Sequence, residues 1–213
     1  MDYKKLQSCF IPETNTRYVV IEGDPGAGKT RVLQVISGQP ATVVVPELNH
    51  LSPGSRGQLK GSLAKWYIQA ERERQDEVRC SLRRGCRVFQ DRSVLSTLAF
   101  ACAQSASDGR QAEMLLEEMA RIGPFLAPDI LFVLHVNIAE SMRRRSAFSK
   151  DERYKIWFDQ AFFARFKDCL SLAVGCLPTR KMIAIDTTHL NPSAVAQKVI
   201  NLIEFCDPPF REP

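Results

Sequence analysis

Short apolar segments alternate with longer mixed stretches along most of this chain, and this alternation predicts its secondary structure. The apolar segments predict buried strands at residues 17–22, 41–46, 86–91, 129–136 and 181–186. The mixed stretches predict helices at residues 29–37, 56–84, 92–107, 111–122, 138–145, 153–174 and 192–205. Strands that alternate with helices are typical of a parallel sheet covered on both faces. Ligands of such folds bind beyond the carboxyl ends of the strands, so we expect functional residues just after each strand.

The first predicted strand is joined to the first predicted helix by a glycine loop, residues 23–30, with the sequence GDPGAGKT. It fits the phosphate-binding pattern G-x-x-x-x-G-K-S/T, in which backbone N–H groups and a helix N-terminus surround an anion. Lys29 would reach the β- and γ-phosphates of a nucleoside triphosphate, and the Thr30 hydroxyl would ligate Mg²⁺. The alternative is a chance match in a glycine-rich turn, which the flanking strand and helix disfavour. The residues predicted to bind the triphosphate are Gly23, Asp24, Gly26, Ala27, Gly28, Lys29, Thr30 and Arg31.

Composition fits one α/β domain over residues 1–213, with 45% hydrophobic and 25% charged residues. The net charge of +5 is mildly basic, and phosphate-handling arginines and solvated helix faces account for it. Nucleic acid would also explain this charge, but no basic patch interleaved with aromatic residues supports such a partner. We therefore expect a small-molecule partner and no nucleic acid.

The cysteine content and the hydropathy of the chain indicate where in the cell we expect this protein. The seven cysteines include no C-x-x-C spacing and no paired Cys/His ligands, so we do not expect zinc. Their number is typical of reduced thiols in the cytoplasm. The chain shows no apolar leader at its start and no stretch of eighteen apolar residues, so we expect no membrane segment.

Charged residues follow the second and third predicted strands. Glu47 comes after residues 41–46, where a carboxylate could take the proton of an attacking hydroxyl or bond a sugar. Asp91 ends the third strand, where an acid could hold Mg²⁺, and Arg92 beside it could bind an acceptor oxygen. The alternatives are a solvated acid at Glu47 and a simple salt bridge between Asp91 and Arg92.

Two further segments have both a functional and a structural interpretation. The charged run from Arg143 to Arg153 could close over a triphosphate, although such runs are usually solvated helix faces. Trp66, Gln69 and Glu73 lie on one face of the long predicted helix, with Arg72 on an adjoining one. The aromatic, amide and guanidinium groups could bind a planar base, or these residues belong to the core and surface. His135 lies inside an apolar strand and is interpreted as a core histidine.

Taken in order, these residues resemble the thymidylate kinase and deoxynucleoside kinase group of the nucleoside monophosphate kinase-like fold. Val45-Pro46-Glu47 is similar to the V-P-E-P of deoxynucleoside kinases, whose Glu is the general base. Asp91-Arg92-Ser93 resembles the D-R-Y/H and D/E-R-S motifs of the two families. Gln69-Ala70-Glu71-Arg72 resembles the helix segment whose Arg contacts thymine, and residues 146–148 and 152–154 resemble the thymidylate kinase lid.

The resemblance covers nearly the whole chain and implies a three-layer P-loop kinase fold with a five-stranded parallel sheet. It further implies Mg·ATP as phosphoryl donor, a homodimer, and a short arginine-rich lid at residues 143–153. The implied catalytic residues are Lys29, Glu47, Arg92, Arg143 and Arg153. The implied substrate-binding residues are Glu47, Trp66, Gln69, Arg72 and Arg92, and the implied metal ligands are Thr30 and Asp91.

Two departures from the family affect the acceptor. Thymidylate kinases carry an acid where this chain has Pro25, and a phosphate-clamping Arg where it has Val44. Loss of one charge-assisted phosphate contact costs about 1.5–3 kcal/mol. The sequence therefore favours transfer to the hydroxyl of a nucleoside or nucleoside-like metabolite, with a nucleoside monophosphate as the alternative. A P-loop ATPase or nucleotide-binding protein without an acceptor is a third interpretation, which Glu47 and Arg92 disfavour.

Overall fold

The computed structural model describes residues 2–12, 17–48, 63–104 and 110–206. A five-stranded parallel sheet, in the order β3-β4-β2-β6-β7, forms the centre of this part of the chain, as predicted. Its strands are β2 (Tyr18–Gly23), β3 (Thr42–Val45), β4 (Arg87–Asp91), β6 (Ile130–His135) and β7 (Lys181–Asp186). Each lies within two residues of its predicted bounds at either end.

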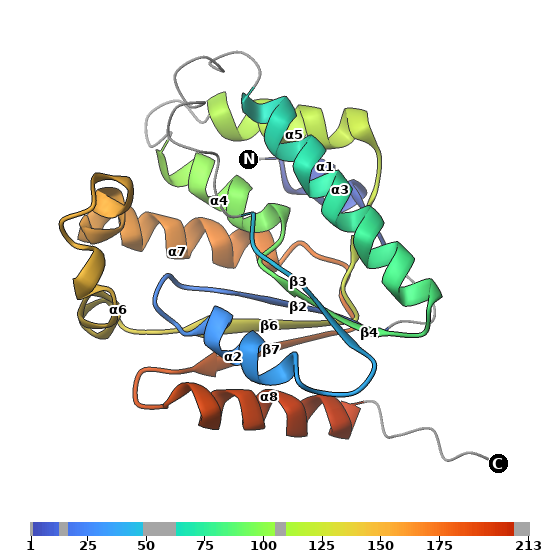
Figure 1. Ribbon diagram of the computed structural model, residues 1–213. Helices are drawn as coiled ribbons and strands as arrows, with labels where there is room; N and C mark the ends of the chain where they lie inside the picture. The colour runs from blue at the N-terminus through green and yellow to red at the C-terminus, as the bar shows by residue number, and fades with distance from the viewer. Residues whose placement is uncertain (1, 13–16, 49–62, 105–109, 207–213) are drawn as a thin grey trace.

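Helices cover both faces of the sheet and make a three-layer fold (Figure 1). One face carries α2 (Lys29–Ile36) and α8 (Pro192–Cys206). The other face carries α3 (Leu63–Arg83), α4 (Val94–Gln104), α5 (Arg110–Ile122) and α7 (Gln160–Val174). A short helix, α6 (Ile138–Arg144), follows β6. None of the described helices is both long enough and apolar enough to cross a membrane.

Two hydrophobic cores lie on the two sides of the sheet. In β2, Val19 and Ile21 belong to the core beneath α2 and α8, whereas Tyr18 and Val20 belong to the core beneath α3, α4, α5 and α7. This division follows from the period of two in a strand, which sends successive side chains to opposite faces. Because both faces are buried, the strand is a continuous apolar run rather than an alternating one.

The structure corrects several helix boundaries. The predicted helix at 153–174 is divided into a 3₁₀ segment, η3 (Glu152–Phe158), and α7. The division falls at Asp159, whose carboxylate accepts hydrogen bonds from the amides of Ala161 and Phe162 at 2.8 and 3.1 Å and caps α7. Helix α4 begins at Val94 rather than at residue 92, because Arg92 has a left-handed backbone with φ of 58°.

Other boundaries and elements were not predicted. Helix α3 is described from Leu63, and residues 56–62 of the predicted helix lie outside the described part, as do residues 105–107. Helix α1 (Tyr3–Ser8) and a second, small parallel sheet of β1 (Phe10–Pro12) and β5 (Phe125–Ala127) were missed. These strands are too short for a sequence pattern to identify. A second 3₁₀ segment, η2 (Ser146–Phe148), follows α6.

Strand register aligns the predicted site residues. Ile21 of β2 lies beside Asp91 of β4, and Val45 of β3 lies beside Gln90 of β4. The glycine loop, Glu47 and Asp91 therefore lie at the same edge of the sheet, where the carboxyl ends of β2, β3 and β4 meet. The close approach of the loop to β6 at this edge requires glycine, since a Cβ at Gly23 (φ 135°) would lie 2.1 Å from the Leu134 carbonyl oxygen.

Gly23→Ala is expected to destabilise the protein far more than Gly85→Ala. Both glycines have positive φ, but a Cβ at Gly85 (φ 78°) meets no atom within 4 Å. Gly85→Ala should cost about 1 kcal/mol from backbone strain alone. Gly23→Ala should cost at least about 2 kcal/mol more, because β6 cannot move away without breaking the sheet. Urea unfolding measures both, and equal losses would show that this contact with β6 is not rigid.

Candidate active site

The glycine loop forms a tight turn at the start of α2. Gly28 precedes the helix with a left-handed φ of 94°, and the amide of Asp24 donates to the Leu134 carbonyl at 2.9 Å. The Lys29 ammonium is buried and donates to the carbonyls of Gly23 at 2.9 Å and Asp24 at 2.8 Å. The loop, the helix N-terminus and Lys29 thus place positive charge around one point.

Burial lowers the pKa of Lys29 to about 8, and the nearby charge of Arg92 acts in the same direction. Asp91, Glu47 and Glu22 oppose this shift without cancelling it. A polyphosphate bound at the loop would supply the missing negative charge. The protonated form of Lys29 would then be favoured, which suits its predicted role as a point charge on a phosphate.

Asp24 contributes to the loop through its backbone rather than through a side chain aimed at a ligand. Its carboxylate is 1% exposed, accepts from the Val136 amide at 2.9 Å and pairs with the Lys167 ammonium at 3.0 Å. Burial alone would raise its pKa, but the hydrogen bonds from His135 and Val136 and the charge of Lys167 hold it below its ordinary value. His135 lies 3.7 Å from this carboxylate, and its side chain is 35% exposed. It therefore lies at the carboxyl end of β6 and not in the core, contrary to its prediction.

The two predicted metal ligands lie together. The Thr30 hydroxyl donates to Oδ2 of Asp91 at 3.0 Å. The other oxygen, Oδ1, is buried and accepts no hydrogen bond from any described group. Burial raises the pKa of Asp91 despite the charge of Lys29, so a cation beside the carboxylate would favour its ionised form. A hydroxyl and one carboxylate, completed by phosphate oxygens and water, fit Mg²⁺.

Glu47 and Arg92 form an ion pair, with Nε and Oε1 2.7 Å apart, at the ends of β3 and β4. The left-handed backbone of Arg92 turns its guanidinium toward the loop, where it donates to the Gly23 carbonyl at 3.1 Å and the Ser96 hydroxyl at 2.9 Å. Arg74 of α3 donates to the carbonyls of Asp91 and Arg92 at 2.6 and 3.1 Å. Glu47 and Arg92, which were predicted to contact the acceptor, are therefore adjacent. Arg74 holds the backbone of Arg92 in place.

Glu22 is a site residue that sequence reasoning missed. It is the last residue but one of β2, is 0% exposed, and accepts hydrogen bonds from the Ser93 amide at 2.7 Å and hydroxyl at 2.8 Å. The Ser96 hydroxyl donates to its second oxygen. A carboxylate buried without such partners would cost several kcal/mol. An acid inside an apolar strand directly before the glycine loop was the signal in the sequence.

A cavity of about 570 Å³ opens beside the Glu47–Arg92 pair. We call it the acceptor cavity. Its described walls include four aromatic side chains, from Tyr67, Phe100, Trp157 and Phe166. Its charged lining residues are Glu47, Glu71, Glu152 and Arg92. Aromatic side chains with a few polar groups among them are typical of a binding site for a planar ligand.

The face of α3 that lines the cavity differs from the predicted one. Tyr67 and Glu71, one turn apart, line it, whereas the predicted residues Trp66, Gln69 and Arg72 do not. Arg72 donates to the Pro124 carbonyl at 3.0 Å, Gln69 donates to Glu73, and Trp66 packs edge-on against Tyr67. A helix turns about 100° per residue, so an error of one position moves a side chain to another face.

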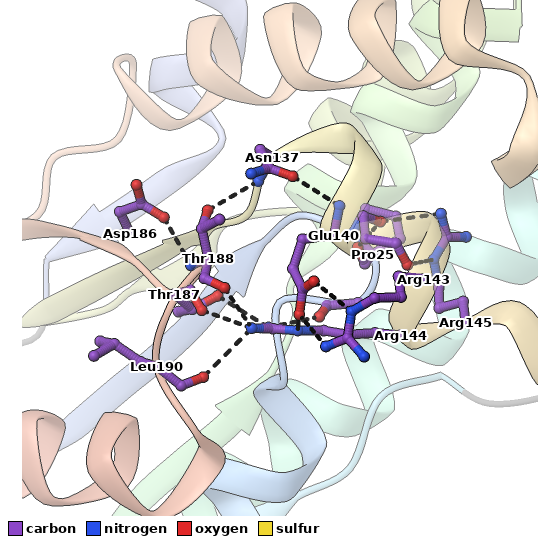
Figure 2. Close-up of polar contacts among 12 residues, drawn as sticks. Pro25, Asn137, Glu140, Arg143, Arg144, Arg145, Asp186, Thr187, Thr188 and Leu190 are labelled. Atoms are coloured by element: carbon purple, nitrogen blue, oxygen red, sulfur yellow. Dashed lines mark hydrogen bonds and ion pairs between the residues drawn. The ribbon is translucent and has the colours of Figure 1, made fainter.

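The lid arginines differ in role (Figure 2). Arg143 is 74% exposed and pairs with Glu140 at 2.6 Å. Arg144 instead crosses from α6 to the loop and to the turn after β7, with carbonyl contacts to Gly26 at 3.2 Å and Thr187 at 2.7 Å. The side chain of Arg153, also predicted to be catalytic, lies outside the described part of the structure.

Arg145, the next residue along, is bound on the acceptor side of the lid. Its guanidinium donates to the Ser141 hydroxyl at 3.1 Å and the Trp157 carbonyl at 2.9 Å, and lies 5.0 Å from the centre of the Phe158 ring. Burial, with the charge of Arg92 in addition, lowers its pKa. Sequence spacing identified a basic run but could not distinguish these three neighbours.

Comparison with known proteins identifies one matching family model, described as thymidylate kinase, over residues 48–199. The matched segment begins just after Glu47, so the glycine loop lies outside it. No curated protein shows a significant match to the sequence.

Solved structures of similar fold include a thymidylate kinase from Candida albicans, with a TM-score of 0.64 and 15% identity over 88% of this chain and 91% of that one. A deoxyadenosine kinase from M. mycoides with bound dCMP and dCDP has a TM-score of 0.65 and 16% identity, covering 88% of this chain and 98% of the other. A thymidylate kinase from Ehrlichia chaffeensis has a TM-score of 0.56 and 20% identity, covering 90% and 100%. At these identities the likeness concerns the fold alone.

Triphosphate binding is expected to take up a proton at pH 9 and far less at pH 7. Lys29, with a pKa near 8, is mostly neutral in the free protein at pH 9 and becomes protonated against the phosphates. Calorimetry in buffers of different ionisation enthalpy gives the number of protons. Lys29→Arg, which stays charged throughout, should abolish the difference. A proton count that is the same at both pH values would mean that Lys29 does not meet the phosphates.

Arg144→Ala is expected to destabilise the protein, whereas Arg143→Ala should leave its unfolding midpoint unchanged. Arg144 donates to carbonyls of two separate segments, and loss of such charge-assisted bonds costs about 1.5–3 kcal/mol. Arg143 has one exposed ion pair. Thermal unfolding of the two variants compares neighbouring residues of the same type. Equal midpoints would contradict the structural role of Arg144.

Proposed function

The chain belongs to the thymidylate kinase family, and from this premise we propose that it transfers the γ-phosphoryl group of Mg·ATP to a nucleoside hydroxyl. Membership of the family makes it an ATP-dependent nucleoside or nucleotide kinase. The proposal concerns the acceptor, which the family alone does not specify.

The charge of the acceptor cavity carries the proposal. Among the described residues that line it, Glu47, Glu71 and Glu152 are acids and Arg92 is the one cation. Arg92 is already paired with Glu47 at 2.7 Å. A monophosphate acceptor needs cations to offset its own charge, and here it would enter beside carboxylates. A neutral hydroxyl acceptor meets no such repulsion.

The same residues suit deprotonation of a hydroxyl. Glu47 is about one-third exposed and opens to the cavity, so an acceptor hydroxyl can reach its carboxylate. Arg92 contacts the Oε1 atom of this carboxylate, and the carboxylate could take the proton of such a hydroxyl. Arg92 would then bind the acceptor oxygen and keep it close to the glycine loop, to which its own guanidinium is hydrogen-bonded.

On the donor side, the glycine loop and Lys29 would hold the β- and γ-phosphates. Thr30 and Asp91 would hold Mg²⁺, which neutralises charge on the transferring group when bound. The lid would supply further positive charge, and we assign this role to Arg145, because its guanidinium lies near Arg92 and the loop-contacting Ser141. The predicted roles of Arg143 and Arg153 stay predictions.

A nucleoside monophosphate is the alternative acceptor, which the family match and the lid sequence favour. The absence of an arginine at Val44 does not decide between the two. Val44 packs with the core beneath α2 and α8, on the face of the sheet opposite the acceptor cavity. An arginine at this position would leave the sheet on the face opposite the cavity.

Glu47→Gln is expected to lower kcat with a nucleoside at least about a hundredfold, because general-base contributions are about 10²–10⁴-fold. Glutamine keeps the size and the contact to Arg92 but cannot take a proton. The binding of ATP, measured separately, should change little and serves as the control for folding. If turnover survives the substitution and the wild type prefers monophosphates, the hydroxyl acceptor is wrong and the alternative takes its place.

A further inference from the structure

We infer that the nucleoside acceptor carries an amino group on its base and that Glu71 binds this group, which makes Glu71 the residue that determines base specificity. The inference rests on the proposed function, since it names the class of nucleoside used at the same site. It is based on the placement of one buried carboxylate in the wall of the acceptor cavity.

Glu71 is held firmly. It is 2% exposed, and both of its carboxylate oxygens accept from NH1 of Arg74, at 2.8 and 2.9 Å. The NH2 group of Arg74 is bound to the carbonyls of Asp91 and Arg92, so this arginine is fixed from both ends. Each oxygen of a carboxylate has two acceptor sites, and one on each remains after the contact with Arg74. Glu71 therefore offers acceptors, in a fixed direction, to a ligand in the cavity.

Aromatic side chains determine how a base would lie. Tyr67 precedes Glu71 by one helical turn on the same face of α3, and Phe100 and Trp157 line the cavity from α4 and η3. The Phe100 and Trp157 rings are in contact, with centroids 5.4 Å apart. A planar base stacked on such walls presents its polar edge, not its face, to Glu71. The sugar of the same nucleoside would extend toward Glu47 and Arg92.

The chemistry of an ionised carboxylate distinguishes amino from keto groups. It can only accept, so it pairs with an exocyclic N–H, as Asp and Glu do with the amino group of cytosine. A keto oxygen at the same place would face another acceptor and leave both groups without a donor. Gln104 and Gln111 also line the cavity, but an amide both donates and accepts and does not discriminate by itself.

The ionisation state of Glu71 determines the pH at which base discrimination should be measured. Burial raises its pKa to about 7, although the charge of Arg74 opposes this shift and Glu22 and Glu47 add to it. At pH 8 the carboxylate form predominates, whereas a protonated carboxyl could donate to a keto group. Discrimination should therefore be measured at pH 8.

The test compares kcat/KM, with Mg·ATP at pH 8, within two pairs of nucleosides. Deoxycytidine and deoxyuridine differ by amino and keto at one ring position, as do deoxyadenosine and deoxyinosine. The wild type is expected to prefer the amino member of the pair that it uses by at least about tenfold. Glu71→Gln, whose amide can donate to a keto oxygen, should reduce this ratio to about threefold or less, or invert it.

Glu73→Gln is the matched control. Glu73 lies on the same helix, is exposed, and bonds Gln69 outside the cavity, so this variant should keep the wild-type ratio. A ratio of two substrates on one protein does not depend on the fraction that is folded, which protects the comparison if Glu71→Gln is less stable. Should that variant fail to fold, Glu71→Asp keeps the charge and should keep the direction of the preference.

Each outcome has one meaning. A wild type that uses keto nucleosides as well as amino nucleosides, or better, overturns the inference but leaves the proposed function in place. An unchanged ratio in Glu71→Gln shows that another residue selects the base, which also overturns it. If no nucleoside accepts a phosphoryl group, the proposed function has failed, and the inference fails with it.

Discussion

The site depends on one buried carboxylate, Glu22, which joins the strand before the glycine loop to the start of α4. Its contacts with Ser93 and Ser96 fix the segment that follows β4, which begins with Arg92 directly after Asp91, the last residue of the strand. Arg74 of α3 completes the support by binding the carbonyls of the same two residues. Because these groups lie away from water, each must keep its partner, and the proposed phosphate-binding and acceptor halves of the site hold a fixed geometry.

The two halves differ in charge, and this difference explains the proposed chemistry. The donor half has Lys29, the amides of the glycine loop and Arg144, which joins the loop to the turn after β7. The acceptor half has three carboxylates and one arginine among its described lining residues. In the proposed function, phosphate binds on the first side and a neutral, proton-donating molecule on the second. Arg92 stands at the boundary, hydrogen-bonded to the loop and paired with Glu47.

Much of the fold and part of the site could be predicted from the sequence, because those features are local. Apolar runs identify the strands, and the glycine loop, Glu47 and Asp91 each stand at the end of a strand or just after it. The missed features depend on contacts between distant segments. Glu22 and Arg144 act on residues far along the chain, and the phase of α3, which brings Glu71 rather than Arg72 to the cavity, is determined by packing. The break at Asp159 was missed because its capping contacts compete with a helix pattern that continues on both sides.

The central claim is that the acceptor half of the site is built for a hydroxyl and not for a phosphate. The most direct measurement follows ADP release from Mg·ATP with a nucleoside and with the 5′-monophosphate of the same nucleoside, across a set of bases. The account predicts that kcat/KM is higher for the nucleoside, because the monophosphate brings negative charge beside Glu47, Glu71 and Glu152. A monophosphate that is phosphorylated more efficiently than its nucleoside would contradict it.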